Sequence, residues 1–326
     1  MLSDRFERTI TYLRISVTDR CNFRCVYCMP AEGVELVPHE EILSFEEIVR
    51  VVEAGAKLGL TKLRLTGGEP TVRRDLPQLV AMLRSIEGIR EIAMTTNGAR
   101  LVELAGPLHE AGLARLNISL DTLNPERAQN IARRDFHAKV LAGIEAAAAV
   151  GFPLKFNTVV MRGVNDHEVA ELVRFAHGYG AQIRFIEYMP MGLTAFSEAN
   201  RMVPSAELRA RLGLIYDLIP DPAGDRHDPA RPYICRNTGA RVGFIGSMTE
   251  NFCAGCNRMR LTAQGGLRPC LHQDVEVDVR AILRSGGDEA AIQAAFQEAA
   301  GLKWSGHHMT DVIPLYTARE MVSIGG

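Results

Sequence analysis

The chain lacks any long apolar segment. No run among its 326 residues approaches the length of about 18 residues that suggests a membrane-spanning helix. The first segment, Met1 to Arg14, carries charges where a signal peptide has its apolar stretch. We therefore expect a cytoplasmic protein with no membrane partner.

The chain also lacks an excess of charge of one sign. It has 37 Lys and Arg against 39 Asp and Glu, a formal net charge of −2, and only 6% aromatic residues. A nucleic-acid-binding module normally carries a basic stripe with interleaved aromatics, so we expect no nucleic-acid partner. An anionic ligand would have to be held by local charge. The hydrophobic fraction of 47% is that of a globular protein, and the length suits one large domain or two.

Seven cysteines are the unusual part of the composition. A disulfide framework is not expected in a reducing compartment and a chain of this length. All but one of the cysteines fall into two groups, which are Cys21, Cys25 and Cys28, and Cys253, Cys256 and Cys270. Cys235 stands alone, and we expect it to be a small buried hydrophobic residue. The two groups, called here the first and second triads, indicate metal binding.

The first triad has the spacing C-x3-C-x2-C. A structural zinc site normally needs four ligands, and the only nearby candidate for a fourth is His39. Three thiolates in a short loop can instead hold a four-iron cluster and leave its last iron open for another ligand. The spacing thus favours a cluster at which chemistry takes place.

Strand-like and helix-like segments alternate through the first two-thirds of the chain. The expected strands are Tyr12–Thr18, Lys62–Thr66, Glu91–Thr96, Arg115–Leu120, Leu154–Met161 and Gln182–Tyr188. Among the helices, Ser44 and Glu47 form a capping box for one that Gly59 ends. Asp166 is expected to cap another that ends at Gly178. Six such βα units predict a parallel sheet, either doubly wound or closed toward a barrel.

Alternate positions of several strands are polar. They are Arg14, Ser16 and Thr18; Arg64 and Thr66; Thr95 and Asn97; Asn117, Ser119 and Asp121; and Lys155 and Asn157. A parallel sheet covered by helices has little solvent face, so we expect these side chains to line a wet lumen. An incomplete barrel of six units provides such a lumen more readily than a filled barrel of eight.

The loops that follow the expected strands carry the remaining signals. The first triad follows the first strand, Gly67-Gly68-Glu69-Pro70 follows the second, and Met189-Pro190 follows the last. Active sites of such folds lie at these carboxyl ends. The triad, with Tyr27 before its last cysteine, and the Gly-Gly-Glu-Pro loop resemble the radical S-adenosylmethionine (SAM) superfamily over about residues 10–190. The resemblance implies an α/β fold, an incomplete (β/α)6 TIM-like barrel, in which the open iron binds SAM and a 5′-deoxyadenosyl radical abstracts hydrogen.

A second part of the chain begins where the βα rhythm ends. We expect a core over residues 1–191 and a cluster-binding extension over residues 192–326. The second triad, C-x2-C-x13-C, lies in this extension. Judged by spacing alone, zinc with His272 as a nearby ligand and an iron–sulfur cluster are about equally favoured. The first triad favours a second cluster with an open iron.

Arginines lie close to the second triad. Arg258 and Arg260 alternate, so in a strand they face one side. With Arg268 nearby, they predict a fork-like site suited to phosphates. Further basic residues are expected to join them in a locally positive pocket, namely Arg14, Arg64, Arg73 and Lys155.

These motifs, together with the final Gly325-Gly326, resemble the GTP-cyclising family of molybdenum cofactor biosynthesis (the MoaA family) over nearly the whole chain. The resemblance implies two 4Fe-4S clusters, one on each triad, with the second binding guanine. It implies SAM contacts at Tyr27, Gly68, Ser119 and Met189. It implies GTP contacts at Arg14, Arg64, Thr95, Lys155, Arg258, Met259 and Arg260. Catalytic roles are implied for Arg14, Arg258, Arg260, Gly325 and Gly326.

The family reaction joins the 3′ carbon of GTP to carbon 8 of its guanine, the first step of molybdopterin synthesis. The implied partners are GTP, a reducing electron donor and the cyclic pyranopterin monophosphate synthase that receives the product. The sequence is also compatible with a homodimer. One alternative is a radical SAM enzyme that modifies a peptide and carries an auxiliary cluster. Another is a zinc-binding regulatory or nucleic-acid module, whose basic stripe is missing.

Overall fold

The computed structural model describes residues 1–190, 201–225, 227–307 and 320–325. Within these residues the strands form one sheet in the order β12-β11-β10-β1-β2-β3-β4-β5-β6-β9-β8-β7. The first six are β1 Tyr12–Ser16, β2 Lys62–Thr66, β3 Glu91–Thr96, β4 Arg115–Ser119, β5 Leu154–Val160 and β6 Gln182–Glu187. The others are β7 Leu218–Pro220, β8 Arg231–Cys235, β9 Arg241–Ile245, β10 Arg258–Leu261, β11 Gly266–Arg268 and β12 Val277–Asp278.

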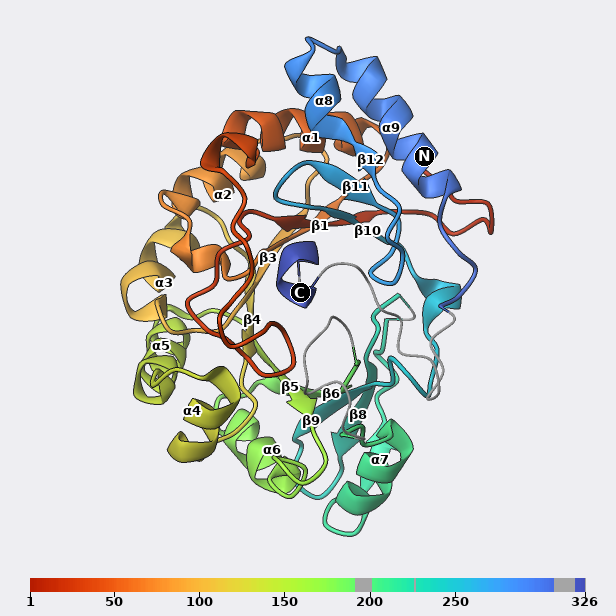
Figure 1. Ribbon diagram of the computed structural model, residues 1–326. Helices are drawn as coiled ribbons and strands as arrows, with labels where there is room; N and C mark the ends of the chain where they lie inside the picture. The colour runs from red at the N-terminus through yellow and green to blue at the C-terminus, as the bar shows by residue number, and fades with distance from the viewer. Residues whose placement is uncertain (191–200, 226, 308–319, 326) are drawn as a thin grey trace.

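Helices cover the outer face of this curved sheet (Figure 1). Those that follow the first six strands are α1 Phe45–Lys57, α2 Leu76–Arg84, α3 Leu101–Glu110, α4 Pro125–Ala132, α5 His137–Val150, α6 Val169–Gly178 and α7 Ser205–Gly213. Near the carboxyl end come α8 Val279–Arg284 and α9 Glu289–Gly301, which lie beside α1. Outward-facing strand residues such as Leu13, Ile15 and Leu63 are buried beneath the helices. No described helix is both long enough and apolar enough to cross a membrane.

The predicted partial barrel is confirmed, because β1 to β6 are parallel neighbours connected through helices. Residues of the extension lengthen the same sheet at both edges. On one side β10 pairs with β1 in parallel, and on the other β9 pairs with β6 in parallel. In the described chain β12 and β7 remain the two ends of the sheet, which is therefore an open barrel.

Most expected elements are found where they were predicted. β2 and β3 have the expected bounds, and the other core strands end one or two residues early. The capping box of α1 is present, with Glu47 N donating to Ser44 Oγ (3.1 Å) and Ser44 N to Glu47 Oε2 (2.8 Å). The prediction that Asp166 caps α6 is wrong. Its carboxylate accepts from Gly163 N (2.8 Å) and pairs with Arg211 instead, and the helix begins later, at Val169.

The carboxyl end of the chain returns to the middle of the barrel. The short 3-10 helix η5, Met321–Ile324, lies inside the ring of strands in Figure 1. Its residues Val322 and Ile324 are buried. A terminal segment would normally be poorly ordered unless it is held, so this burial places it among the parts that can shape the lumen.

Candidate functional site

A cavity of about 390 Å³ occupies the lumen of the barrel. Ligand sites commonly have volumes of a few hundred Å³. The polar strand positions predicted to face the lumen largely do so. Those that line the cavity are Arg14, Arg64, Thr66, Thr95, Asn97, Asn117, Ser119, Asp121 and Asn157. Both triads line the same cavity.

The first triad lies on the loop after β1. Arg24 N and Val26 N donate to the carbonyls of Ala132 and Ile131, both at 2.9 Å, which anchors this loop on α4. Burial raises the pKa of Cys21 to about 11 and that of Cys28 to about 12, and repulsion from neighbouring charges adds to both shifts. Three thiols that resist ionisation when alone need a positive ligand to become thiolates together.

The donor set of the first triad fits an iron–sulfur cluster with an open iron. His39, the candidate fourth zinc ligand, is exposed on η1, His39–Glu41, and is not among the residues that line the cavity. In the described parts of the chain no group of three or more His, Cys, Asp or Glu residues is arranged to hold a single metal ion. Three cavity-facing thiols without a fourth protein ligand are what a cluster with one open position requires.

The Gly-Gly-Glu loop after β2 packs directly against the base of the triad loop. A Cβ on Gly68 would lie 2.3 Å from the carbonyl oxygen of Arg20, so only glycine fits. Glu69 is buried and accepts hydrogen bonds from Thr96 Oγ1 (2.6 Å) and Asn97 N (2.7 Å). Burial raises the pKa of Glu69, and its bonds join the loops that follow β2 and β3. The loop thus presents Gly68 to the cavity on a rigid support.

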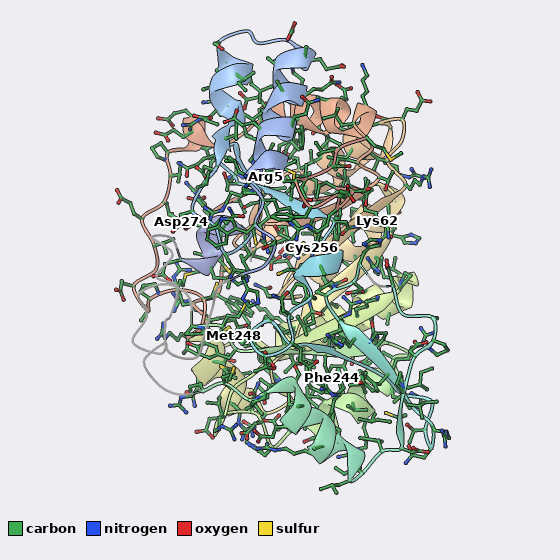
Figure 2. The ribbon with its side chains drawn as sticks, turned by 90° about the vertical axis from the view of Figure 1, so that its right-hand side faces the viewer. Arg5, Lys62, Phe244, Met248, Cys256 and Asp274 are labelled. Atoms are coloured by element: carbon green, nitrogen blue, oxygen red, sulfur yellow. The ribbon has the colours of Figure 1, made fainter. Side chains whose placement is uncertain are left out.

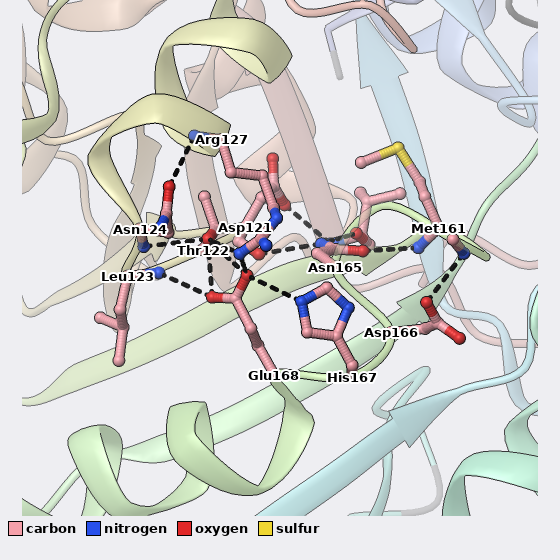
Figure 3. Close-up of polar contacts among 12 residues, drawn as sticks. Asp121, Thr122, Leu123, Asn124, Arg127, Met161, Asn165, Asp166, His167 and Glu168 are labelled. Atoms are coloured by element: carbon pink, nitrogen blue, oxygen red, sulfur yellow. Dashed lines mark hydrogen bonds and ion pairs between the residues drawn. The ribbon is translucent and has the colours of Figure 1, made fainter.

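Tyr27 is held by Asp121, a carboxylate that was expected in the lumen but was not predicted to contact a ligand or Tyr27. Its hydroxyl donates to Asp121 Oδ2 (2.8 Å), and Val159 N donates to Asp121 Oδ1 (2.9 Å). Burial raises the pKa of Asp121 to about 6. Asn165, fully buried, donates to the carbonyls of Asp121 (2.8 Å) and Val159 (2.9 Å), so it ties the ends of β4 and β5 together (Figure 3).

A second carboxylate completes this network. Glu168 accepts from Thr122 Oγ1 and from Leu123 N (3.1 Å), and it forms an ion pair with Arg127 of α4 (Figure 3). Asn165 and Glu168 carried no sequence signal, because both lie in the loop before α6 and act through contacts with distant residues.

Arginines from three neighbouring strands form a wall of the cavity. Arg14 is the register partner of Arg64 on one side and of Arg260 on the other, and Arg258 faces the cavity one pleat away. Burial, followed by repulsion from Arg260 and Arg64, lowers the pKa of Arg14 well below its usual value. Burial also lowers the pKa of Arg260, to about 10. A polyanion placed against this wall would relieve the repulsion.

The last described segment, residues 320–325, is called here the tail and contacts the same arginines. Gly325 O accepts from Arg14 Nη2 (3.3 Å) and from Arg260 Nη1 (3.2 Å). Gly325 also lines the cavity and has a φ of +80°, a conformation that favours glycine. Gly326 lies outside the described residues.

The second triad lines the same cavity as the first, and its Cys256 is labelled in Figure 2, near the middle of the molecule. Burial alone would raise the pKa of Cys256, but Arg258 and Lys303 lower it to about 6. Arg258 Nη2 donates to its sulfur at 3.5 Å. His272 also lines the cavity; burial and His307 lower its pKa to about 3. Among the described residues the triad and His272 are not arranged around a single metal ion, so the donor set fits a second cluster better than zinc.

Two arginines that were predicted to join the positive pocket, Arg268 and Arg73, do not line the cavity. Arg268 is fully buried but donates to the carbonyl of Gln273 and pairs with Asp274 (3.3 Å), so it does not line the cavity. Arg73 donates to the carbonyls of Val17 (2.5 Å) and Leu43 (2.8 Å). These two predictions were wrong, because Arg73 is held by backbone carbonyls distant in sequence and Arg268 by a carbonyl and a carboxylate five and six residues away.

The remaining predicted residues divide into two sets. Tyr27, Gly68, Ser119 and Met189 all line the cavity. Lys155 and the side chain of Met259 are not among its lining residues. Burial and repulsion from Arg184 and Arg115 lower the pKa of Lys155 to about 8, and Met259 packs in the core. Arg184 does line the cavity and was missed, although its alternation within β6 could have indicated it.

Comparisons with known proteins agree with this geometry. Residues 15–176 match the family described as the radical SAM superfamily, and residues 181–309 match that described as Molybdenum Cofactor Synthesis C. A GTP 3′,8-cyclase of Moorella thermoacetica is 46% identical over 326 residues and one of Pelotomaculum thermopropionicum is 47% identical over 332, each alignment covering all of both chains. Streptococcus suis SuiB bound to S-adenosylmethionine shares the fold, with a TM-score of 0.62 at 16% identity over 88% of this chain and 68% of that one.

Proposed function

The chain belongs to the GTP 3′,8-cyclase family of radical SAM enzymes, and on that basis we propose that it converts GTP to a 3′,8-cyclised dihydro-GTP. This reaction is the first step of molybdenum cofactor biosynthesis. The observation that carries the proposal is the arginine wall, which lies in one cavity with two thiol triads. A triphosphate bound to these arginines would therefore lie in the same cavity as the iron–sulfur clusters held by the two triads.

The first triad would hold the cluster that binds SAM, with Tyr27, Gly68, Ser119 and Met189 as the cofactor contacts. The second triad would hold the other 4Fe-4S cluster. When bound, these groups supply the chemistry that removes a hydrogen atom from the ribose of GTP. The triad loop positions its ligands through α4, and the Asp121 carboxylate orients Tyr27.

The arginines have the task of holding GTP in one orientation. Arg14, Arg64 and Arg260 present adjacent guanidinium groups to an anion, and Thr95 adds a hydroxyl within 3.4 Å of Arg64. Lys155, Arg258 and Met259 are the other proposed contacts. Cyclisation joins C3′ to C8, with one hydrogen atom lost and one electron and one proton gained. Because two atoms of one substrate must meet, gripping both its phosphates and its base accounts for much of the catalysis.

We propose that the tail and the arginines of the cavity wall together bind the substrate. Gly325, and Gly326 beyond it, would complete the surface that Arg14 and Arg260 present to the substrate. Arg14, Arg258 and Arg260 are also placed to stabilise negative charge that develops on the guanine.

The finer assignments are proposals of the same kind. A reducing electron donor, a homodimer and transfer of product to the cyclic pyranopterin monophosphate synthase are proposed partners, and the cytoplasm is the proposed location. We also propose a core of residues 1–191 and an extension of residues 192–326, which the two matched families support.

An anaerobic assay tests the proposal. Protein with both clusters reconstituted is expected to contain about eight irons and, with SAM, GTP and a reductant, to form a cyclised nucleotide. Zinc with little iron would contradict it. So would a full complement of iron with no product from GTP, an outcome that would favour the peptide-modifying alternative.

A further inference from the structure

Lys303 is a buried lysine between the two segments that carry the second triad. It follows α9, its side chain lines the cavity, and the residue is 2% exposed. Its Nζ donates to the carbonyl of Arg258 (2.9 Å) and to that of Pro269 (2.7 Å). Arg258 lies two residues after Cys256, and Pro269 immediately precedes Cys270. One ammonium group thus joins the backbone beside two of the three thiols.

The positive charge of the Lys303 ammonium group indicates a role beyond joining the two backbone segments. Among the described residues, no carboxylate lies within ion-pair distance of Lys303, whereas nearby Arg8 pairs with Asp4 at 2.6 Å while donating to Cys253 O at 2.8 Å. A buried cation that meets only neutral carbonyls is costly unless an anion lies close by.

The anions available to Lys303 are the thiolates of the second triad. The two carbonyls that Lys303 Nζ contacts belong to residues beside Cys256 and Cys270, and both cysteines line the same cavity as Lys303. Cysteines bind metal as thiolates, so a cluster on this triad would place negative charge near the ammonium group. Groups just outside a metal's ligands commonly orient those ligands and tune the metal. The potential of an iron–sulfur cluster depends on net charge and hydrogen bonding around it.

We propose that Lys303 is a positioning residue for the second cluster, which holds the Cys270 segment against β10 and raises the cluster's reduction potential through its positive charge. The inference rests on the proposed function in one respect, that the second triad holds an iron–sulfur cluster. It adds that the extension contributes a cation to the surroundings of the second cluster as well as its ligands.

The test measures the second cluster by itself. In full-length protein with Cys21, Cys25 and Cys28 all replaced by Ser, the iron that remains belongs to the second triad. The parent and the Lys303→Met, Lys303→Gln and Lys303→Arg variants are reconstituted anaerobically and titrated with a reductant while the electron spin spectrum is recorded. Iron release to a chelator is measured in parallel. Lys57→Met serves as the matched control, because Lys57 is exposed and pairs with Glu289.

Lys303→Met is expected to shift the midpoint potential to more negative values and to release iron roughly 10- to 100-fold faster, the range typical of such outer contacts. Lys303→Gln keeps a hydrogen-bond donor without the charge, so it should retain more iron yet show the shifted potential. Lys303→Arg should remain near the parent, and Lys57→Met should match it. If Lys303→Met does not fold, Lys303→Gln still tests the effect of charge.

An unchanged potential in iron-loaded Lys303→Gln would overturn the inference while leaving the proposed function intact. A parent protein that binds no iron at the second triad would overturn the proposed function, and the inference with it.

Discussion

Among single residues, Cys28 and Cys235 have the same side chain in different surroundings. Cys28 lines the cavity beside the other thiols of its triad, whereas Cys235 is fully buried at the end of β8 in the hydrophobic core. We expect Cys28→Ala to abolish SAM cleavage, because the cluster loses a ligand. Cys235→Ala should leave iron content unchanged and cost about 1 kcal/mol of stability. Iron analysis, a SAM cleavage assay and thermal unfolding check both variants, and iron loss from Cys235→Ala would contradict the assignment.

Lys155 gives a prediction with a defined pH dependence. Its pKa in the folded protein is lowered to about 8, chiefly by burial, so the ammonium loses its proton as pH rises through that value. The neutral amine attracts phosphate less, and kcat/KM for GTP should therefore fall above about pH 8. Since kcat/KM reports the ionisation of the free enzyme, its pH profile is the measurement.

Lys155→Arg is the matched variant, because a guanidinium stays charged over the same range. It should remove the fall near pH 8. A wild-type profile that stays flat between pH 7 and 9.5 would show that Lys155 does not act on GTP.

Side-chain predictions from the sequence succeeded where alternation along a strand decided the outcome. Arg14, Arg64 and Asn117 face the cavity because the pleat of a strand fixes the side on which a residue lies. Arg73 and Arg268 were misassigned because sequence proximity does not reveal which partners are nearer in space. Asp121 was expected in the lumen, but its bond to Tyr27 spans 94 positions of the chain and could not be predicted.

At the scale of elements, the terminal segment gives the clearest test. The carbonyl of Gly325 accepts from Arg14 and Arg260, and neither of these hydrogen bonds involves a cysteine of the two triads. Deleting Gly325 and Gly326 should leave iron content unchanged and remove most GTP cyclisation. Iron analysis and product formation measure the two effects.

A single substitution tests whether the backbone conformation of the tail matters when its length is unchanged. Gly325→Ala places a Cβ 3.1 Å from Thr66 Oγ1 at a φ of +80°, so it should also impair cyclisation. Gly301→Ala, where an added Cβ meets nothing within 4 Å, is the control. A truncated protein that remains fully active would refute the role of the tail.

Elements were predicted best where the local signals agreed. β2 alternates leucines with polar residues, β3 is mostly apolar or β-branched, and α1 has a capping box at its start. The start of α6 was misjudged because Asp166 has a stronger partner in Arg211, which belongs to α7. Local sequence fixes an element's type more firmly than its first residue.

For the whole molecule, the sequence predicted the six-unit core but not how the extension meets it. β10 pairs with β1 in parallel, joining Tyr12 to Arg258. Short strands such as β10 and β9 have no sequence feature that selects a partner so distant. Family resemblance supplied the roles of the arginines near the second triad, whereas their position beside β1 required the structure.

This arrangement predicts the behaviour of a fragment. Residues 1–191 alone would leave β1 and β6 as exposed strand edges, and the described extension covers both with β10 and β9. Unpaired edges promote association between chains. We expect the fragment to form soluble aggregates or inclusion bodies, as measured by light scattering. A monomeric, cooperatively unfolding fragment would show that the core closes without the extension.

The pairing of β1 with β10 also sets an order of events during synthesis. A ribosome releases the first strand long before it has made the residues from 258 to 261 that lie beside it. At a rate of about 5–20 residues per second, that interval lasts on the order of ten to fifty seconds. The edge of β1 that β10 covers in the finished protein is therefore unpaired until translation is nearly complete.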